Sequence, residues 1–160
     1  MKKEKESKTN AMRQLDKAHI AYQLCTYDIS IDEFSGVEVS KQLGIPADAC
    51  FKTLALTHEN DLYICVVPVA KEMDLKKAAA QIGVKDLHMI AVKDLLKKVG
   101  YQRGSVSPLG IIAKHKTYFD QSINNHEEIE ISAGKFGYGL KVNAQELLHF
   151  LKAEVKDLCC

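Results

Sequence analysis

Two β-rich runs, residues 51–58 and 62–69, flank the three polar residues 59–61. Strong strand formers on either side of a short polar turn predict an antiparallel hairpin, which commits the middle of the chain to a β-sheet. A chain of 160 residues buries roughly 70% of the surface that its unfolded form exposes. We therefore expect one domain over residues 1–160, with a core that needs neither disulfides nor a structural metal.

Capping residues and closing glycines predict helices along the rest of the chain. Thr9 or Asn10 is expected to cap a first helix, and Asp74 to cap a helix that Gly83 closes. A capping-box pattern opens the helix that ends at Gly44, and another opens the last helix. The helices expected from these signals cover residues 9–18, 35–44, 74–83, 92–99 and 143–151.

Further strands are expected outside the hairpin, over residues 22–28, 87–91, 111–113, 118–119 and 128–132. About six or seven short strands and four or five helices thus follow one another in an irregular order. This order favours an α/β (α+β) fold in which a mixed, barrel-like curled sheet is surrounded by helices. A doubly wound parallel sheet is the less favoured alternative.

Charge and hydropathy limit the function classes. Twenty-two Lys and Arg residues balance 21 Asp and Glu residues, and the net charge of +1 argues against a protein that coats nucleic acid. The charged N-terminus is not followed by an apolar signal core, and no run approaches the ~20 apolar residues that cross a bilayer. We expect a cytoplasmic protein that does not associate with membranes.

The five cysteines have neither C-x-x-C nor C-x-x-H spacing, so they indicate neither a disulfide framework nor a zinc site. Cys25, Cys50 and Cys65 are expected to be reduced, small, buried side chains. Residues 1–8 and 158–160, the latter with two more cysteines, are expected to be flexible termini. The six histidines are scattered, and we predict no metal and no cofactor.

Two features could carry chemistry. Lys52 shares a strand face with Leu54 and Leu56, so it points into the core or a cavity mouth if that face is inward, and into solvent if the Phe51 face is inward. The pattern leaves both alternatives open. The loop 104–110 combines glycines, serines and a proline, which suits close approach of its backbone to a carboxylate, an ester carbonyl or a phosphate.

These features belong to a set of segments that resembles one family in order and spacing. The chain is similar, from about residue 10 to 155, to the bacterial Cys-tRNA(Pro) deacylases of the YbaK/EbsC family, which are related to the editing domain of bacterial prolyl-tRNA synthetases. The segments that carry the resemblance are 26–28 (Thr-Tyr-Asp), 50–54 (Cys-Phe-Lys-Thr-Leu), 67–70, 74–77, 100–110 with its Gly-x-x-Ser-Pro-Leu-Gly motif, and 132–137.

The resemblance implies a trans-editing hydrolase that deacylates Cys-tRNA(Pro), and also Cys-tRNA(Cys), in the cleft of a mixed α/β barrel-like fold. Lys52 would be the essential catalytic lysine. In the route proposed for the family, the substrate's own thiol attacks its ester, so no protein nucleophile, metal or cofactor is required. The substrate-binding residues implied by the resemblance are Tyr27, Phe34, Thr53, Gly104, Ser107, Pro108 and Gly134.

One position departs from the family pattern. Many relatives have an Asp or another polar residue where this chain has Gly139, so a role of that side chain in holding the substrate amine is in doubt. This departure leaves open a non-catalytic module that binds tRNA or a synthetase. Editing of another misacylated tRNA also stays open, because related editing domains differ mainly in pocket size. The implied partners are the tRNA acceptor end and prolyl-tRNA synthetase, with the chain as a monomer or homodimer.

Overall fold

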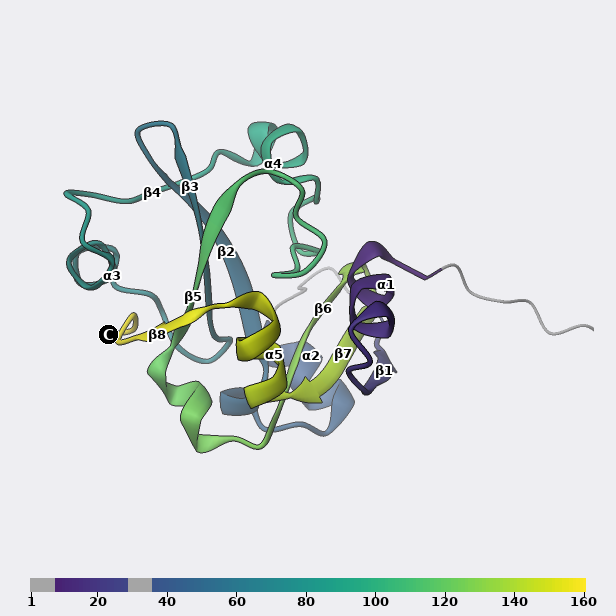
Figure 1. Ribbon diagram of the computed structural model, residues 1–160. Helices are drawn as coiled ribbons and strands as arrows, with labels where there is room; N and C mark the ends of the chain where they lie inside the picture. The colour runs from purple at the N-terminus through teal and green to yellow at the C-terminus, as the bar shows by residue number, and fades with distance from the viewer. Residues whose placement is uncertain (1–7, 29–35) are drawn as a thin grey trace, which may run out of the picture.

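The computed structural model describes residues 8–28 and 36–160, and these residues form eight strands in two sheets together with five α-helices (Figure 1). The first sheet has three antiparallel strands in the order β1-β7-β6, with bounds β1 (Tyr22–Thr26), β6 (Glu128–Lys135) and β7 (Tyr138–Asn143). The second has five strands in the order β4-β2-β3-β5-β8, with bounds β2 (Phe51–His58), β3 (Asp61–Pro68), β4 (His88–Met89), β5 (His115–Asp120) and β8 (Glu154–Lys156).

The five helices lie where the capping signals predict them. The side chains of Thr9, Asp74 and Asn143 each accept a hydrogen bond from the backbone N–H three residues later. None of the helices in the described part of the chain is long and apolar enough to cross a membrane. Their bounds are α1 (Asn10–Lys17), α2 (Gly36–Leu43), α3 (Leu75–Ile82), α4 (Val92–Val99) and α5 (Ala144–Leu151).

The central hairpin is also confirmed. β2 and β3 pair in antiparallel register from Phe51 opposite Pro68 to His58 opposite Asp61. The hairpin is not at a sheet edge, because β5 adds parallel to β3 and β4 adds antiparallel to β2. The central strand β3 is therefore buried on both faces, which explains why it is rich in apolar residues at successive positions.

The expected single barrel-like sheet of six or seven strands is wrong. The chain builds two separate sheets with eight strands, and the described residues show no closed barrel. Outside the named strands, an isolated bridge between Cys50 and Glu130 joins the start of β2 to β6. One bridge does not continue a hydrogen-bond ladder, so the two sheets face a shared core without closing on each other.

Two apolar cores occupy the two faces of the five-stranded sheet. The larger lies between the two sheets, where residues such as Phe119, Ile131 and Leu140 pack with the apolar faces of α1, α4 and α5. The smaller lies on the opposite face, where Leu56 and Cys65 pack against α3. Figure 1 shows α3 on the far side of the five-stranded sheet from α1 and the three-stranded sheet.

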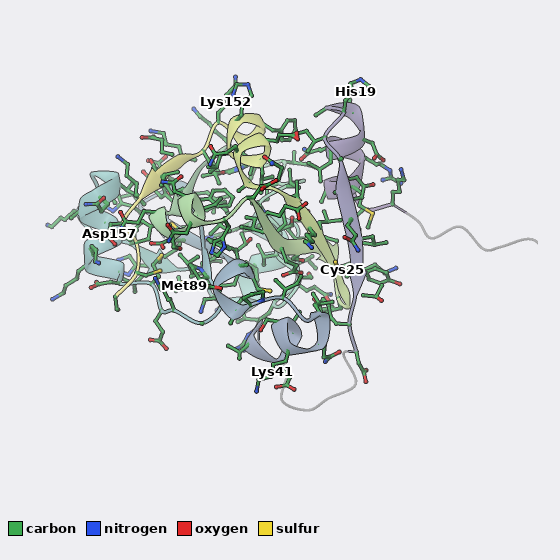
Figure 2. All side chains as sticks on the ribbon, turned by 90° about the horizontal axis from the view of Figure 1, so that it is seen from below. His19, Cys25, Lys41, Met89, Lys152 and Asp157 are labelled. Carbon is green, nitrogen blue, oxygen red and sulfur yellow. The ribbon has the colours of Figure 1, made fainter. Side chains whose placement is uncertain are left out.

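Two predictions of local structure are wrong. Residues 111–113 are not a strand: Ile112 is 93% exposed, and β5 starts only at His115. The expected flexible end at 158–160 is instead packed, because Leu158 is fully buried and its N–H donates to the Asp120 carboxylate at 3.0 Å. An ion pair of 3.1 Å between Lys77 and Asp157 adds to this packing beside α3 (Figure 2).

Two of the three expected buried cysteines are fully enclosed. Cys50 and Cys65 are buried, while Cys25 on the edge strand β1 is partly exposed (Figure 2). Burial raises the pKa of the Cys50 and Cys65 thiols to about 12, so both remain protonated at neutral pH. These side chains act as small apolar groups, as expected.

Candidate active site

A cavity of about 150 Å³ lies between the start of β2, strand β6, helix α2 and the loop after α4. Its size fits a small amino-acid side chain and its backbone, not a large ring system. Polar and apolar groups alternate on its walls. The lining residues are Tyr27, Gly36, Val39, Phe51, Lys52, Thr53, Val69, Gly104, Val106, Glu130 and Ser132.

Four of the eight site residues expected from the sequence meet at this cavity: Tyr27, Lys52, Thr53 and Gly104. Phe34 lies outside the described residues. The other three expected residues lie elsewhere: Ser107 is fully buried in its loop, Pro108 lines a separate hollow, and Gly134 lines a larger cavity described below.

Lys52 occupies the rim of the cavity. The sequence left open whether the Phe51 face or the Leu56 face of this strand points inward, and both do. Phe51 and Ala55 pack into the large core, and Leu56 packs into the small one. Lys52 is half-buried on the Leu56 face, opposite Val67, and makes no ion pair with any described residue. Its ammonium therefore remains available to an anionic or carbonyl-like ligand.

The Lys52 ammonium also acts on the C-terminal segment, which packs on the same face of β2 as Leu56. Burial raises the pKa of the Cys159 thiol to about 12, and the positive charges of Lys71 and Lys52 oppose this rise. The C-terminal segment is therefore within electrostatic range of Lys52. This contact was not foreseen, because the last three residues were expected to be flexible.

Thr53 carries an unpartnered polar atom. The residue is 9% exposed, and its hydroxyl oxygen has no hydrogen-bond partner in the described structure. A buried hydroxyl without a partner costs free energy, on the order of 1–3 kcal/mol. Because Thr53 lines the cavity, a bound ligand with a donor or an acceptor would remove that cost.

Glu130 is the functional candidate that the sequence did not reveal. It alternates with Ile129 and Ile131 in β6, and this pattern predicts a solvent-exposed carboxylate. In the structure Glu130 is only 5% exposed, because Cys50 bridges to it across that face. Burial raises the pKa of Glu130 to about 8, and a hydrogen bond from the Cys50 thiol opposes part of the rise.

The electrostatic effect of Glu130 reaches its neighbours. Burial raises the pKa of Tyr27 to about 12, and the negative charge of Glu130 adds to that rise. The same two causes, in the same order, raise the pKa of the partly exposed Cys25 thiol. The carboxyl therefore shapes the chemistry of the cavity wall even though it lies on a strand face that the sequence predicted to be outside.

The loop between α4 and β5 is held by its own hydrogen bonds. The Tyr101 hydroxyl donates to the Leu109 carbonyl at 2.6 Å, and the Ser107 hydroxyl accepts from the Leu109 N–H at 3.3 Å. Ser132 of β6 donates to the Ser105 carbonyl at 2.9 Å, which anchors the loop to the cavity wall. Ser107 thus stabilises a turn inside the loop, and its hydroxyl is not presented to the cavity.

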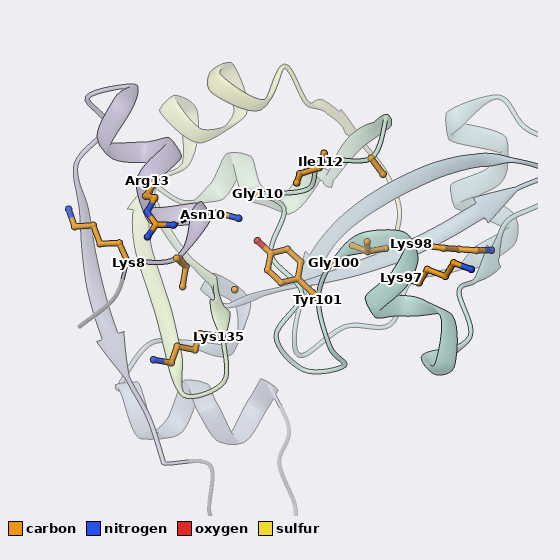
Figure 3. Close-up of a pocket in the computed structure, with 14 residues that line it drawn as sticks. Lys8, Asn10, Arg13, Lys97, Lys98, Gly100, Tyr101, Gly110, Ile112 and Lys135 are labelled. Atoms are coloured by element: carbon orange, nitrogen blue, oxygen red, sulfur yellow. Dashed lines mark hydrogen bonds between the residues drawn. The ribbon is translucent and has the colours of Figure 1, made fainter. Parts of the chain in front are cut away.

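A second cavity of about 760 Å³ lies on the other side of this loop. Figure 3 shows Lys8 and Arg13 on one side of Tyr101 and Lys97 and Lys98 on the other, with Lys135 below Arg13. Five cations line this space, of which Lys8 pairs with Asp16, and none of the lining residues in the described part of the chain is acidic. Both cavities share their walls: β6 contributes Ser132 to the small one and Lys135 to the large one.

The comparisons with known proteins define the class. The aminoacyl-tRNA editing domain family matches residues 34–150, which include every lining residue of the small cavity except Tyr27. The chain therefore belongs to the aminoacyl-tRNA editing domain family. Membership of this family makes the chain an aminoacyl-tRNA editing enzyme.

Individual relatives agree with this class. The chain is 32% identical over 98% of its length to a candidate Cys-tRNA(Pro)/Cys-tRNA(Cys) deacylase of Enterococcus faecalis, EbsC, 96% of which is covered. It is 29% identical over 63% of its length to 18% of a proline–tRNA ligase of Shouchella clausii. A solved candidate trans-editing enzyme for prolyl-tRNA synthetase, 21% identical, superposes with a TM-score of 0.81 over 96% of this chain and 99% of that one.

Proposed function

We propose that this protein is a trans-editing hydrolase that deacylates Cys-tRNA(Pro). The small cavity would hold the aminoacyl group, and the cationic cavity would contact phosphates of the tRNA acceptor end. The observation that carries the proposal is the pairing of a small, partly polar cavity with a larger cationic one across the same loop and strand. The substrate named for EbsC supports the choice of amino acid and tRNA.

Cleavage of an aminoacyl ester requires few catalytic groups from the protein. An aminoacyl ester is already activated, so a site that orients the ester and polarises its carbonyl accelerates its cleavage. In the proposed route the substrate Sγ forms a bond to its own carbonyl carbon, and the bond from that carbon to the ribose oxygen breaks. The thiol proton ends on the ribose oxygen, and water then opens the cyclic thioester.

Lys52 would supply positive charge at the rim of the cavity during this step. Its ammonium has no anionic partner among the described residues, so its charge is not already compensated. We place it beside the oxygens of the terminal ribose or phosphate. Tyr27 and Thr53 would line the aminoacyl group, and the Gly104 backbone would approach the ester.

Lys52→Ala tests this assignment in a deacylation assay with Cys-tRNA(Pro) and a panel of other charged tRNAs. We expect at least a hundredfold loss of kcat/KM for the preferred substrate. The matched control is Lys71→Ala, which removes an exposed lysine that also acts on Cys159. Full activity in Lys52→Ala, or no deacylation of any tRNA by the wild type, would exclude the proposal.

A second candidate function is editing of a different misacylated tRNA. The small volume of the cavity bears on it, because the size of the pocket decides which small side chains an editing site admits. The same panel separates the two functions by the amino acid that is removed fastest. Running it with and without prolyl-tRNA synthetase tests whether that enzyme is a partner, which the similarity to a proline–tRNA ligase supports.

A further inference from the structure

Glu130 is a buried carboxyl for which the described residues supply no cation. It is 5% exposed and makes no ion pair. Its cross-strand neighbour Lys141 is the closest candidate in the register, but that ammonium pairs with Glu128 at 3.7 Å instead. A buried carboxylate without a cation is costly, so this position calls for a positively charged ligand group.

The groups that interact with Glu130 from the neighbouring elements are neutral, and the Lys52 ammonium, which lines the same cavity, makes no ion pair with it. The Cys50 thiol donates a hydrogen bond to it, and both Cys50 and Tyr27 keep their protons because burial raises the pKa of each to about 12. Cys25 from β1 is the third, with a pKa that is also raised. None of these groups can neutralise a carboxylate.

Gly139 makes room for this carboxyl. A Cβ atom at position 139 would lie 1.9 Å from the Glu130 Oε2 atom, far inside the contact distance. Gly139 in β7 pairs with Ser132 in β6, two residues from Glu130. Gly139 is therefore the diagonal cross-strand neighbour of Glu130 on the same sheet face. A side chain at 139 and the present position of the Glu130 carboxyl therefore exclude each other.

An unpartnered polar group belongs to another residue of the same cavity wall. The Thr53 hydroxyl is buried without a hydrogen-bond partner in the described structure, and Thr53 and Glu130 both line the 150 Å³ cavity. Two residues with buried polar groups thus border the same cavity. A ligand with a small cationic head that also donates hydrogen bonds would satisfy both.

We propose that Glu130 is the positioning and specificity residue that binds the α-ammonium group of the aminoacyl ester, and that Gly139 preserves the space for it. This inference rests on the proposed function. The free α-amine is the one cationic group that every aminoacyl-tRNA presents beside its ester. The amine and the carboxyl share one proton as an ammonium–carboxylate pair without net charge, so their burial together is tolerated.

The amine contact would orient the ester and would exclude substrates whose amine is blocked. Peptidyl-tRNA and N-acylated aminoacyl-tRNA lack the cation, and the acyl group also enlarges the part that must enter the cavity. Glu130 therefore separates aminoacyl esters from peptidyl esters. Gly139, which lacks the polar side chain of many relatives, is explained by the carboxyl that β6 supplies in the same place.

The test compares two non-hydrolysable analogues, 3′-cysteinylamino-3′-deoxyadenosine and its N-acetyl derivative, by calorimetric titration. We expect the wild type to prefer the free amine at least tenfold. Glu130→Gln should abolish the preference, and Gly139→Ala should weaken it because the new methyl group displaces the carboxyl. Glu128→Gln, which changes an exposed carboxyl on the same strand, is the matched control and should keep the preference.

A double variant guards against a purely structural effect. Glu130→Ala combined with Gly139→Asp moves the carboxyl from β6 to β7, and it should recover part of the amine preference that Glu130→Ala alone loses. A Glu130→Gln protein that still prefers the free amine overturns the inference. Because analogue binding needs no turnover, this result is separate from the deacylation assay, whose failure would overturn the proposed function alone.

Discussion

The two cavities share a strand and a loop but differ in their chemistry. The small one is walled by the buried residues Glu130 and Thr53, by Lys52 and by apolar side chains. The large one is walled by lysines and an arginine that remain hydrated. Charges act strongly where water is excluded and weakly where salt screens them. The small cavity is thus suited to selecting a ligand, and the large one to holding a polyanion loosely.

A local group of cations is compatible with the near-zero net charge of the whole chain. A protein that gripped a whole tRNA would need many uncompensated cations, and this one has a net charge of +1. Five cations gathered at one cavity still provide a local positive field. We therefore expect weak, salt-sensitive binding of the acceptor end, with the identity of the tRNA body recognised by a partner.

The largest expected effect is on the free energy of unfolding, which the burial of Glu130 beside the small cavity lowers at high pH. The folded-state pKa of Glu130, about 8, lies above its ordinary value of 4.5, so the folded protein keeps a proton that the unfolded chain has released. Stability should therefore fall as the pH rises from about 4.5 to 8. Glu130→Gln should be more stable than the wild type by about 1–3 kcal/mol at high pH, with no difference in acid.

Urea unfolding at several pH values measures this difference. Glu128→Gln should follow the wild-type curve, because Glu128 is exposed. Parallel stability curves for wild type and Glu130→Gln would show that the carboxyl carries no burial cost, and the contrast between the two cavities would then lose its electrostatic basis.

The next effect concerns the cationic cavity. Arg13→Ala combined with Lys98→Ala should weaken binding of the tRNA acceptor stem about tenfold at low salt, and should reduce the slope of log affinity against log salt by roughly one for each lost phosphate contact. Fluorescence anisotropy across a salt series measures both. Lys85→Ala, an exposed lysine beyond α3, is the control. An unchanged slope would mean that the phosphates lie elsewhere.

The smallest expected effect concerns the shared wall. Tyr101→Phe removes the hydroxyl that donates to the Leu109 carbonyl at 2.6 Å, which should cost about 1 kcal/mol of stability. Analogue binding and tRNA binding should both change by less than about twofold, since the ring keeps its packing. A selective loss at one cavity would contradict a common structural role, and paired titrations of the two ligands would reveal it.

The sequence predicts the local elements well because their signals are local. Thr9, Asp74 and Asn143 cap the helices that their spacing predicts, and the closing glycines at 83 and 100 adopt left-handed backbone conformations. The hairpin follows from the two β-rich runs alone. Residues 111–113 are the exception, because a short apolar run resembles a strand even where no neighbour pairs with it.

The site is predicted only in part, because local patterns do not reveal contacts between distant segments. Tyr27, Lys52, Thr53 and Gly104 belong to segments with a recognisable pattern, and they line one cavity. The sequence does not indicate Glu130 as a site residue, because an acidic residue in an alternating strand normally faces water. Its burial depends on Cys50, 80 positions earlier in the chain, and on the absence of a side chain at Gly139.

By itself, the sequence determined the helices with their caps, the central hairpin, the family and the segments that carry its motifs. Only the tertiary structure decided that the strands divide into two sheets, that the C-terminal residues pack against β5 and α3, and that an acid on an outward strand face becomes buried. Helix caps and turns depend on residues a few positions apart, whereas sheet partition and burial depend on contacts between distant segments.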